Sequence, residues 1–536
     1  MSGPFGSNQF FGVSSSDAVW VPKGAIWTNG TDEYLHFTPG STGNNKKFTI
    51  STWLKQIEIA PGSGNHPGLF GAWSNSTNRG QFYFDDGGYI TFFNDVSGSR
   101  HTNISTASTY RRERDPTGWM HLFLAIDSTP ANPGPANIYM TINGEVITPL
   151  ATATYPSQNS TYQWCTSGVK MTVGAGGIGG SYEMYGAYYL SETILLDGYA
   201  GTPSDFAQYD SNGVWVPKDP TDIVTANKGT NGFWLDYADS SDLGNDVSGN
   251  NNDFTLNNIS SSNATADRPA DEAPDTGNYC TLNSAYREGS GYNLSLSNGN
   301  LTYSNASHGL VTSAIGTFPM KSGKWYWEVT LGATTSDMST RIGIAQVDDR
   351  AVNPDGSTSI YLGRTAGSWS FAAWGAYSNA GKKETNATWA DYLNATSTTG
   401  DIISVAFDAD NGAIWIAKNN SWVDGSRTGQ SSATVLASIE TYANTYVMFD
   451  GLTDGPYLPV FTFDGTNGTA TTNFGQTAFN YTPPSGFKKL NTSNMSAPAV
   501  SKSSDSFLPM IYEGNGTGQR VGNFIPFTDS HTVGNS

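Results

Sequence analysis

The sequence has few charged residues, and the charge it carries is mostly of one sign. Charged residues make up 14% of the chain, and 27 Lys and Arg stand against 46 Asp and Glu, which gives a formal net charge of −19. A protein that binds nucleic acid needs a basic face to meet the phosphates. The composition therefore predicts no nucleic acid partner, and it fits contact with neutral sugars, proteins or cations.

Cysteines and long apolar runs are also scarce. The only two cysteines are Cys165 and Cys280, far apart in the sequence, so we expect free thiols and no disulfide framework. The first residues, Met1 to Phe5, lack the basic and apolar segments of a signal peptide, and no uninterrupted apolar run approaches bilayer-spanning length. We therefore expect synthesis in the cytoplasm and no membrane insertion.

The abundant residues are those that favour strands and turns. The chain has 61 Gly and 25 Pro, which favour turns over helix interiors, and 13% aromatic residues, which suit the pleated surface of a sheet. With 536 residues the chain is too long for one hydrophobic core. The composition predicts an all-β protein of two to four domains.

Apolar residues recur with a period of two in the first half of the chain. Residues 48–55, 122–126 and 138–142 each alternate apolar with polar or small side chains, and the last of these runs into Asn143-Gly144. This pattern is typical of half-buried antiparallel strands, and Asn-Gly is typical of a hairpin turn that requires positive φ.

A second strand-rich region begins near residue 291. Trp325 and Trp327 share a face with Val329 and Leu331, and residues 401–418 read as a strand, an Asp-Asn-Gly turn and a second strand. Between the two regions, residues 259–284 are polar, punctuated by Pro and without apolar periodicity, which predicts a linker.

Segments of the first region carry a family resemblance. They are similar to the concanavalin A-like (laminin-G-like) modules of marine phage structural proteins over residues 18–258, and the segments are Tyr34–Pro39, Lys46–Lys55, Trp119–Leu122, Ile138–Gly144 and Gly229–Tyr237. That fold is a two-sheet antiparallel sandwich, which agrees with the alternation.

The second region resembles a SPRY domain over residues 285–490. The segments that carry the likeness are Ser322–Val329, Ile342–Ala345, Gly400–Asp408 and Asn473–Gln476. The same order of modules recurs in predicted tail or fibre proteins of tailed phages. The resemblance implies two antiparallel, jelly-roll type β-sandwiches in tandem, with a virion-anchoring segment at residues 1–17 and a C-terminal tail, or the start of a further module, at residues 491–536.

No pattern of catalytic residues emerges. The concanavalin A-like fold also hosts glucanases, which need two carboxylates about 5 Å apart, and no Glu/Asp/Glu strand cluster of that kind is present. Glu192 and Asp197 are five residues apart and are expected on opposite sides of a strand. The six histidines show no spaced metal or triad signature. We therefore expect no enzyme and no cofactor, with a glycoside hydrolase as the third-ranked alternative.

One loop-like segment is rich in carboxylates. Asp236, Asp239, Asp242 and Asp246 offer the hard oxygen ligands that calcium prefers. Their spacing differs from that of an EF-hand. Calcium binding and ordinary turn capping both remain open at this point.

The remaining candidates for ligand contact are aromatic. An aromatic ring can stack on a sugar, and aromatic residues are favoured anchors in protein contacts. The candidate residues are Trp73, Tyr83 and Tyr89 in the first region and Trp369, Trp374, Tyr377 and Trp389 in the second. The second group crowds a Gly/Ser/Asn-rich stretch and is the stronger prediction.

Together these features predict a phage virion protein, made in the host cytoplasm, that binds at a surface. The first hypothesis is a tail fibre or tail-associated receptor-binding protein that recognises a host glycan or protein, anchored to other virion proteins by its N-terminus. A homotrimer is the preferred assembly, by analogy with the family, because linked weak sites raise the effective concentration. The alternative is a structural or decoration protein of capsid or tail that binds neighbouring virion subunits.

Overall fold

The computed structural model describes residues 20–495 with short gaps. The gaps are 59–63, 65, 108–114, 178–183, 211–212, 271–274, 286–293, 306–311, 333–338, 350–360, 376–379, 394–396, 426, 443–444 and 465–467. The predicted anchoring segment 1–17 and all but the start of the predicted extension 491–536 lie outside the described residues.

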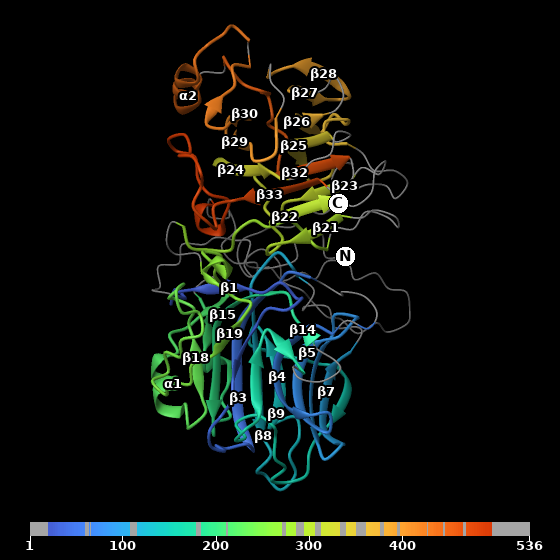
Figure 1. The fold of residues 1–536 in the computed structure, drawn as a ribbon, viewed down its shortest axis with the longest axis vertical. Helices are drawn as coiled ribbons and strands as arrows, with labels where there is room; N and C mark the ends of the chain where they lie inside the picture. The colour runs from blue at the N-terminus through green and yellow to red at the C-terminus, as the bar shows by residue number, and fades with distance from the viewer. Residues whose placement is uncertain are drawn as a thin grey trace, which may run out of the picture. The chain divides into compact units, whose positions relative to one another are not determined.

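The chain is all-β, as predicted, and begins with a sandwich of two eight-stranded sheets (Figure 1). Sheet 1 has the order β10 (Glu145–Val146), β9 (Ile138–Ile142), β8 (Met120–Asp127), β3 (Lys47–Gln56), β15 (Tyr188–Asp197), β1 (Ala25–Trp27) and β20 (Ala264–Thr265), with β18 (Phe233–Leu235) also paired to β15. Sheet 2 has the order β11 (Leu150–Thr154), β7 (Ser99–Thr106), β6 (Ile90–Val96), β5 (Asn78–Phe84), β4 (Gly68–Asn75), β12 (Lys170–Val173), β2 (Tyr34–Phe37) and β19 (Thr255–Asn257).

The first sandwich also contains short elements outside its two large sheets. They are the hairpin of β13 (Ala175–Gly176) with β14 (Met184–Tyr185), the hairpin of β16 (Ala207–Tyr209) with β17 (Trp215–Pro217), the helix α1 (Thr221–Asn227) and the 3-10 turns η2 (Pro203–Asp205) and η3 (Ser261–Asn263). Strands dominate because β-branched and aromatic residues fill them, while Gly, Asn and Asp occupy the turns.

The second sandwich pairs a seven-stranded with a six-stranded sheet. Sheet 3 has the order β21 (Leu294–Ser297), β22 (Thr302–Asn305), β33 (Gly468–Asn473), β24 (Lys324–Leu331), β29 (Ile402–Asp408), β30 (Ala413–Lys418) and β31 (Ser421–Trp422). Sheet 4 has the order β23 (Thr312–Ile315), β32 (Tyr457–Asp464), β25 (Ser339–Gln346), β26 (Ser368–Gly375), β27 (Lys382–Thr385) and β28 (Thr388–Asp391). The helix α2 (Ser432–Thr441) and the 3-10 turn η4 (Thr492–Asn494) complete it.

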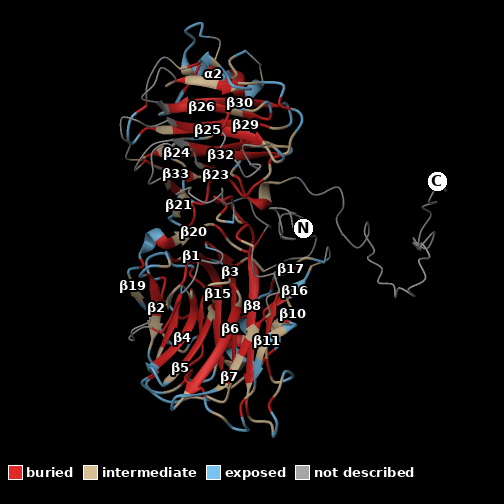
Figure 2. Ribbon diagram, turned by 90° about the vertical axis from the view of Figure 1, so that its right-hand side faces the viewer, coloured by how far each residue is buried: buried red, intermediate tan, exposed pale blue. Residues whose placement is uncertain are grey.

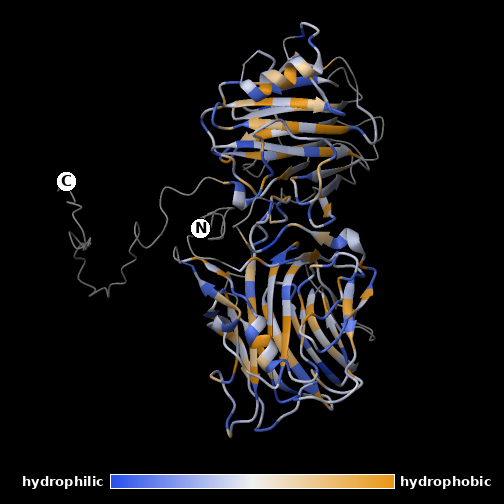
Figure 3. Ribbon diagram, turned by 90° about the vertical axis from the view of Figure 1, so that its left-hand side faces the viewer, coloured by the Kyte–Doolittle hydropathy of each residue, from blue (hydrophilic) through white to orange (hydrophobic). Residues whose placement is uncertain are grey.

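The predicted alternation is confirmed in both sandwiches, and it is visible along the strands in Figure 3. On β24, Trp325 and Trp327 enter the core between sheets 3 and 4, whereas Tyr326 lies on the other face in a cluster with α2. The predicted hairpin joins β9 to β10 through Asn143 and Gly144, which have φ values of 49° and 80°. Turn chemistry and periodicity were therefore read correctly from the sequence.

Sheet 1 is covered on both faces. All residues of β15 and all but the first of β3 are buried, which Figure 2 shows as continuous red strands. One face shares the core with sheet 2, and the other packs against Phe206, Trp215, Val224 and Trp234 from the segment that follows β15. Sheet 2 is therefore the sheet of the first sandwich whose outer face can meet a ligand.

The segment that follows the first sandwich is held by a buried lysine. Lys55 on β3 forms an ion pair with Asp267, and its ammonium also donates to Asn278 Oδ1 (3.0 Å) and to the Tyr279 carbonyl (3.2 Å). Lys55, Asp267 and Asn278 are all at least 96% buried. Ala264–Thr265 pairs with β1, so much of the predicted linker is bonded structure.

The two cysteines are free and buried, in agreement with the prediction. Cys165 belongs to the core of the first sandwich and Cys280 to that of the second. Among the described residues, no helix is long and apolar enough to cross a membrane.

The Lys55–Asp267 pair gives a stability prediction. We expect Lys55→Met to lower the free energy of unfolding by about 3–5 kcal/mol, because it leaves the Asp267 carboxylate buried without its counter-charge. The double variant Lys55→Met/Asp267→Asn removes both charges and is expected to recover part of that loss. Urea denaturation followed by tryptophan fluorescence gives the free energy of unfolding of the wild type, of both single variants and of the double variant, which together form a double-mutant cycle. Strictly additive losses would contradict a direct interaction.

A buried glutamate lies at an irregularity in β15. Glu192 has φ 49° where the register to β3 shifts between Ser191 and Ile194, and its side chain accepts a 2.7 Å hydrogen bond from Trp234 Nε1. Burial raises its pKa to about 8; the Trp234 hydrogen bond opposes that rise, and the nearby Asp236 carboxylate adds to it. Glu192 is therefore a neutral carboxylic acid at pH 7.

This raised pKa predicts a pH dependence of stability. The unfolded chain releases the Glu192 proton near pH 4.5 and the folded chain only near pH 8, so the contribution to stability is complete below pH 4.5 and is lost as the pH rises through 8. Glu192→Gln keeps an acceptor for Trp234 and has no proton to lose. Between pH 5 and 8 we expect the free energy of unfolding of the wild type to fall by about 1.4 kcal/mol per pH unit because of Glu192. The variant should lack this decrease, and urea denaturation at a series of pH values measures it. Parallel wild-type and variant curves would refute it.

Candidate functional site

Five residues form a cross-strand row on the outer face of sheet 2. Lys170 on β12 pairs with Trp73 on β4, Trp73 pairs with Arg79 on β5, Arg79 with Asp95 on β6, and Asp95 with Arg100 on β7. Residues that are directly opposite on paired strands point to the same side of a sheet. The adjacent residues Phe82 and Phe92 belong to the core, so this basic row lies on the outer face.

The basic row is held together by one aspartate. Arg100 donates to both oxygens of Asp95, from Nε at 2.9 Å and from Nη2 at 3.1 Å, and Arg79 Nε donates at 3.1 Å. Burial works to raise the Asp95 pKa, but the hydrogen bonds from Arg100 and Arg79 outweigh it, so the pKa is lowered. Asp95 therefore stays ionised, and with three cations the row carries a net charge of +2.

Aromatic rings support the two guanidinium groups. The Arg100 guanidinium lies 3.7 Å from the centroid of the Phe93 ring, and that of Arg79 lies 5.3 Å from Phe93 and 5.6 Å from Trp73. Such stacking restrains an arginine while leaving N–H groups free to bind. The side chains of Arg100 and Arg79 are 39% and 25% exposed, so a ligand can reach them.

The next row of the outer face is uncharged, and a hairpin covers one end of it. It runs from Thr172 through Gly71, Gln81 and Phe93 to Asn103. At Gly71 an added Cβ would lie 2.6 Å from the Thr172 hydroxyl oxygen and 3.0 Å from Gly176 of β13, so the close approach of the hairpin favours glycine there. The hairpin borders the face on the side of β4 and β12.

The predicted aromatic residues of the first sandwich fall in different places. Trp73 is 8% exposed and lies in the basic row, where it supports Arg79. Tyr83 lies on the same outer face, in edge contact with Phe93 at 6.0 Å. Tyr89 belongs to the turn before β6, where its N–H donates to Asp85 at 2.8 Å. Trp73 and Tyr83 are thus brought together on one face.

The structure does not gather the predicted aromatic residues of the second sandwich into one site. Trp369 on β26 packs against Tyr457 at the core, whereas Trp389 on β28 lies near the Arg341 guanidinium, 4.8 Å from its ring centroid. The two therefore serve opposite faces of sheet 4. Tyr377 and the side chain of Trp374 lie outside the described residues.

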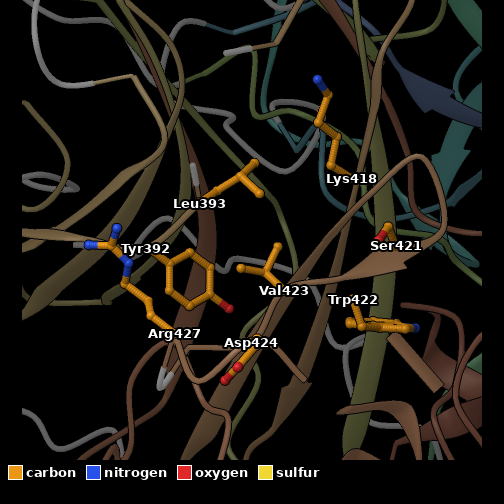
Figure 4. A pocket seen from close by; sticks show the side chains of 9 residues that line it. Tyr392, Leu393, Lys418, Ser421, Trp422, Val423, Asp424 and Arg427 are labelled. Carbon is orange, nitrogen blue, oxygen red and sulfur yellow. The ribbon is translucent and has the colours of Figure 1, made fainter. Parts of the chain in front are cut away.

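A pocket of about 410 Å³ opens where the edge strands of the second sandwich meet (Figure 4). It is lined by Tyr392, Leu393, Lys418, Ser421, Trp422, Val423, Asp424, Arg427 and Gly429. Arg427 is tied to Asp391 at 2.7 Å, and Lys418 to Asp401 at 2.9 Å. Its mixed apolar and charged lining suits a small polar group, and its charged side chains are already paired within the chain.

Three of the four candidate metal ligands cap turns. Asp239 accepts from the N–H and the hydroxyl of Ser241 at 2.9 and 2.6 Å, and Asp246 accepts four hydrogen bonds from N–H and hydroxyl groups. Asp236 caps a backbone N–H at 3.1 Å, and Asp242 is exposed. In the part of the chain that the structure describes, no three His, Cys, Asp or Glu residues converge to hold a metal.

One serine and histidine pair has the composition of a nucleophilic site without its geometry. Trp215 Nε1 donates to His121 Nδ1 at 3.2 Å, so the proton of the neutral ring is on Nε2, which lies 2.9 Å from Ser51 Oγ. Burial lowers the His121 pKa to about 3. This histidine donates to the serine and cannot take its proton, so the pair is structural.

Sequence reasoning missed Lys170, Arg79 and Arg100. They come from three strands that are separated by up to 91 positions, and no local motif marks them. Only the register of sheet 2 places them in one row. The available signal was weak: outward positions of predicted strands with basic residues in an acidic chain.

Comparison with known proteins identifies part of the second sandwich. The family model described as SPRY domain matches residues 324–477, inside the predicted span of 285–490. No curated protein sequence matches the chain. The likeness of the first sandwich to concanavalin A-like lectins and the phage origin stay predictions.

Similar solved structures include two SPRY-type domains and a pentraxin. They are the SPRY domain of human HERC1 (15% identity, 34% of this chain and 96% of that one, TM-score 0.24), the TRIM65 PSpry domain (17%, 36% and 89%, 0.26) and a native heptameric SAP-like pentraxin from Limulus polyphemus (17%, 35% and 81%, 0.26). At these identities and TM-scores no ligand or activity transfers to this chain. From the family model, the chain contains a SPRY domain at residues 324–477.

Proposed function

We propose that this chain is a non-enzymatic receptor-binding protein of a tailed bacteriophage virion, and that the outer face of sheet 2 is the surface that meets the host. The observation that carries the proposal is the basic row. It places three cations and one ionised aspartate on a sheet face, in a protein whose net charge is −19. Two of the three cations are guanidinium groups that stack on aromatic rings.

Burial of the opposite sheet supports this assignment. Sheet 1 is covered by the segment that contains Phe206, Trp215 and Trp234, so it offers no comparable face. A sheet face with ordered donors and acceptors is a recognition surface, since rigid elements hold binding groups more accurately than loops do. The phage context rests on the resemblance of the first module to modules of phage structural proteins, and on the same order of modules in predicted phage tail or fibre proteins.

The candidate carboxylates support a binding role over hydrolysis. Glu192 is buried beside Trp234, and Asp197 accepts backbone N–H groups of Asn44 and Asn231 at 2.6 and 2.9 Å. Both carboxyl groups are hydrogen-bonded within the sandwich, and neither reaches the basic row.

The proposal includes an N-terminal contact with other virion proteins and a homotrimer at the virion surface, which would present three copies of the face.

The proposal predicts competition with the virus. Purified chain, added to host cells before infection, is expected to slow virus adsorption, because it occupies the receptor. Arg100→Ala removes a partly exposed cation from the basic row and is expected to require an about tenfold higher concentration for the same effect. Lys321→Ala, at an exposed lysine of the second sandwich, is the matched control and should compete like wild type.

A second readout separates the two virion roles. Labelling of intact virions with an antibody against the chain should mark the tail or another outward-projecting structure. Virions whose label lies flat over capsid or tail tube, together with unchanged adsorption, would establish the structural or decoration role in place of receptor binding.

A further inference from the structure

We infer that the basic row binds an acidic polysaccharide, with sugar carboxylates on the cations and the chain of rings lying across the strands of sheet 2. The inference rests on the proposed function and names its ligand class. The row is linear because one residue from each of five neighbouring strands contributes to it. A linear row fits a linear polymer.

The residues that carry the cations come from alternate strands of sheet 2. Lys170, Arg79 and Arg100 lie on β12, β5 and β7, and one strand separates each from the next. With about 4.8 Å between neighbouring strands, the backbone positions of these residues are about 10 Å apart and the row is about 19 Å long. The two guanidinium groups converge on Asp95, so the row has one charged centre there and a second at Lys170. Several sugar rings can span that length, so a polymer with carboxylates at intervals gains from more than one contact.

The guanidinium geometry favours carboxylates. Asp95 accepts from Nε and Nη2 of Arg100 through both of its oxygens, so a ligand carboxylate would meet the N–H groups of that guanidinium that Asp95 leaves unused. The remaining N–H groups of Arg79 and Arg100 can donate to further oxygens. Asp95 in turn can accept a sugar hydroxyl, and the neighbouring Gln81 and Asn103 belong to the adjacent polar row.

Single-stranded nucleic acid is the competing anionic polymer, and the same contacts disfavour it. Proteins bind it by stacking bases on open aromatic faces. Here Phe93 is 3% exposed and lies beneath Arg100, and Trp73 is 8% exposed beside Arg79. Neither ring is available for a base.

The test measures binding of the full chain to three polymers by biolayer interferometry. The probes are polygalacturonate as the acidic polysaccharide, dextran as the neutral one and oligo(dT) as the nucleic acid. We expect polygalacturonate to bind, dextran and oligo(dT) to bind at least tenfold more weakly, and the polygalacturonate affinity to fall as NaCl screens the charges.

Variants assign the binding to the row. Arg100→Ala is expected to weaken polygalacturonate binding about tenfold. Arg100→Lys keeps the positive charge but loses the planar guanidinium group. Its affinity for polygalacturonate should lie between those of the wild type and Arg100→Ala. Lys170→Ala tests the far end of the row, and Lys321→Ala is the control with the same loss of charge. Thermal melting verifies that each variant is folded, and Asp95 retains Arg79 as a partner when Arg100 is replaced.

Defined outcomes overturn the inference. The inference is wrong if polygalacturonate does not bind, if dextran binds with equal affinity, or if oligo(dT) binds more tightly. It is also wrong if the Arg100→Ala and Lys170→Ala variants bind polygalacturonate like Lys321→Ala. The proposed function fails separately: a chain that binds polygalacturonate through the row but does not compete for virus adsorption keeps this inference and loses the receptor role. A chain that competes without binding polygalacturonate keeps the receptor role and loses the ligand class.

Discussion

The register of the antiparallel strands is the constraint on which the fold and the candidate site both depend. Sheet 2 has one face in the core, with Phe82 and Phe92. A shift of one residue in the strand register would turn the core side chains of that strand outward. The same register puts Arg79 opposite Asp95 and Asp95 opposite Arg100. Packing of the core therefore also assembles the binding groups on the opposite face.

Burial of a charge determines the path of the chain after the first sandwich. Lys55 is buried in sheet 1, and its ammonium needs partners that the sheet does not supply. Asp267, Asn278 and the Tyr279 carbonyl provide them from the following segment. Because an unpaired buried charge is costly, a stretch that is polar and rich in Pro is nevertheless held in place.

Aromatic residues have three different roles here, and their local sequence does not separate them. Trp369 packs at a core, Trp234 binds the neutral Glu192 acid, and Phe93 supports a guanidinium group. A Trp or Tyr in a strand is a candidate for sugar stacking only if its ring faces solvent. On the outer face of sheet 2, the Trp73 and Phe93 rings face arginines, so the guanidinium groups form the accessible surface.

Alternation of period two and turn residues are local signals, so the residues alone predicted the all-β class, two strand-rich regions and the Asn143-Gly144 hairpin. The SPRY domain was predicted from the resemblance of its segments to that family. Trp73 and Tyr83 remain predicted ligand contacts; both lie on the outer face of sheet 2, where the Trp73 ring faces Arg79. Which polar residues meet depends on the pairing of distant strands. Lys170 joins Arg79 through strand order, and the aspartates near Asp246 cap turns, because pairing between distant strands depends on the packing of the whole core and is not encoded in the spacing of any one segment.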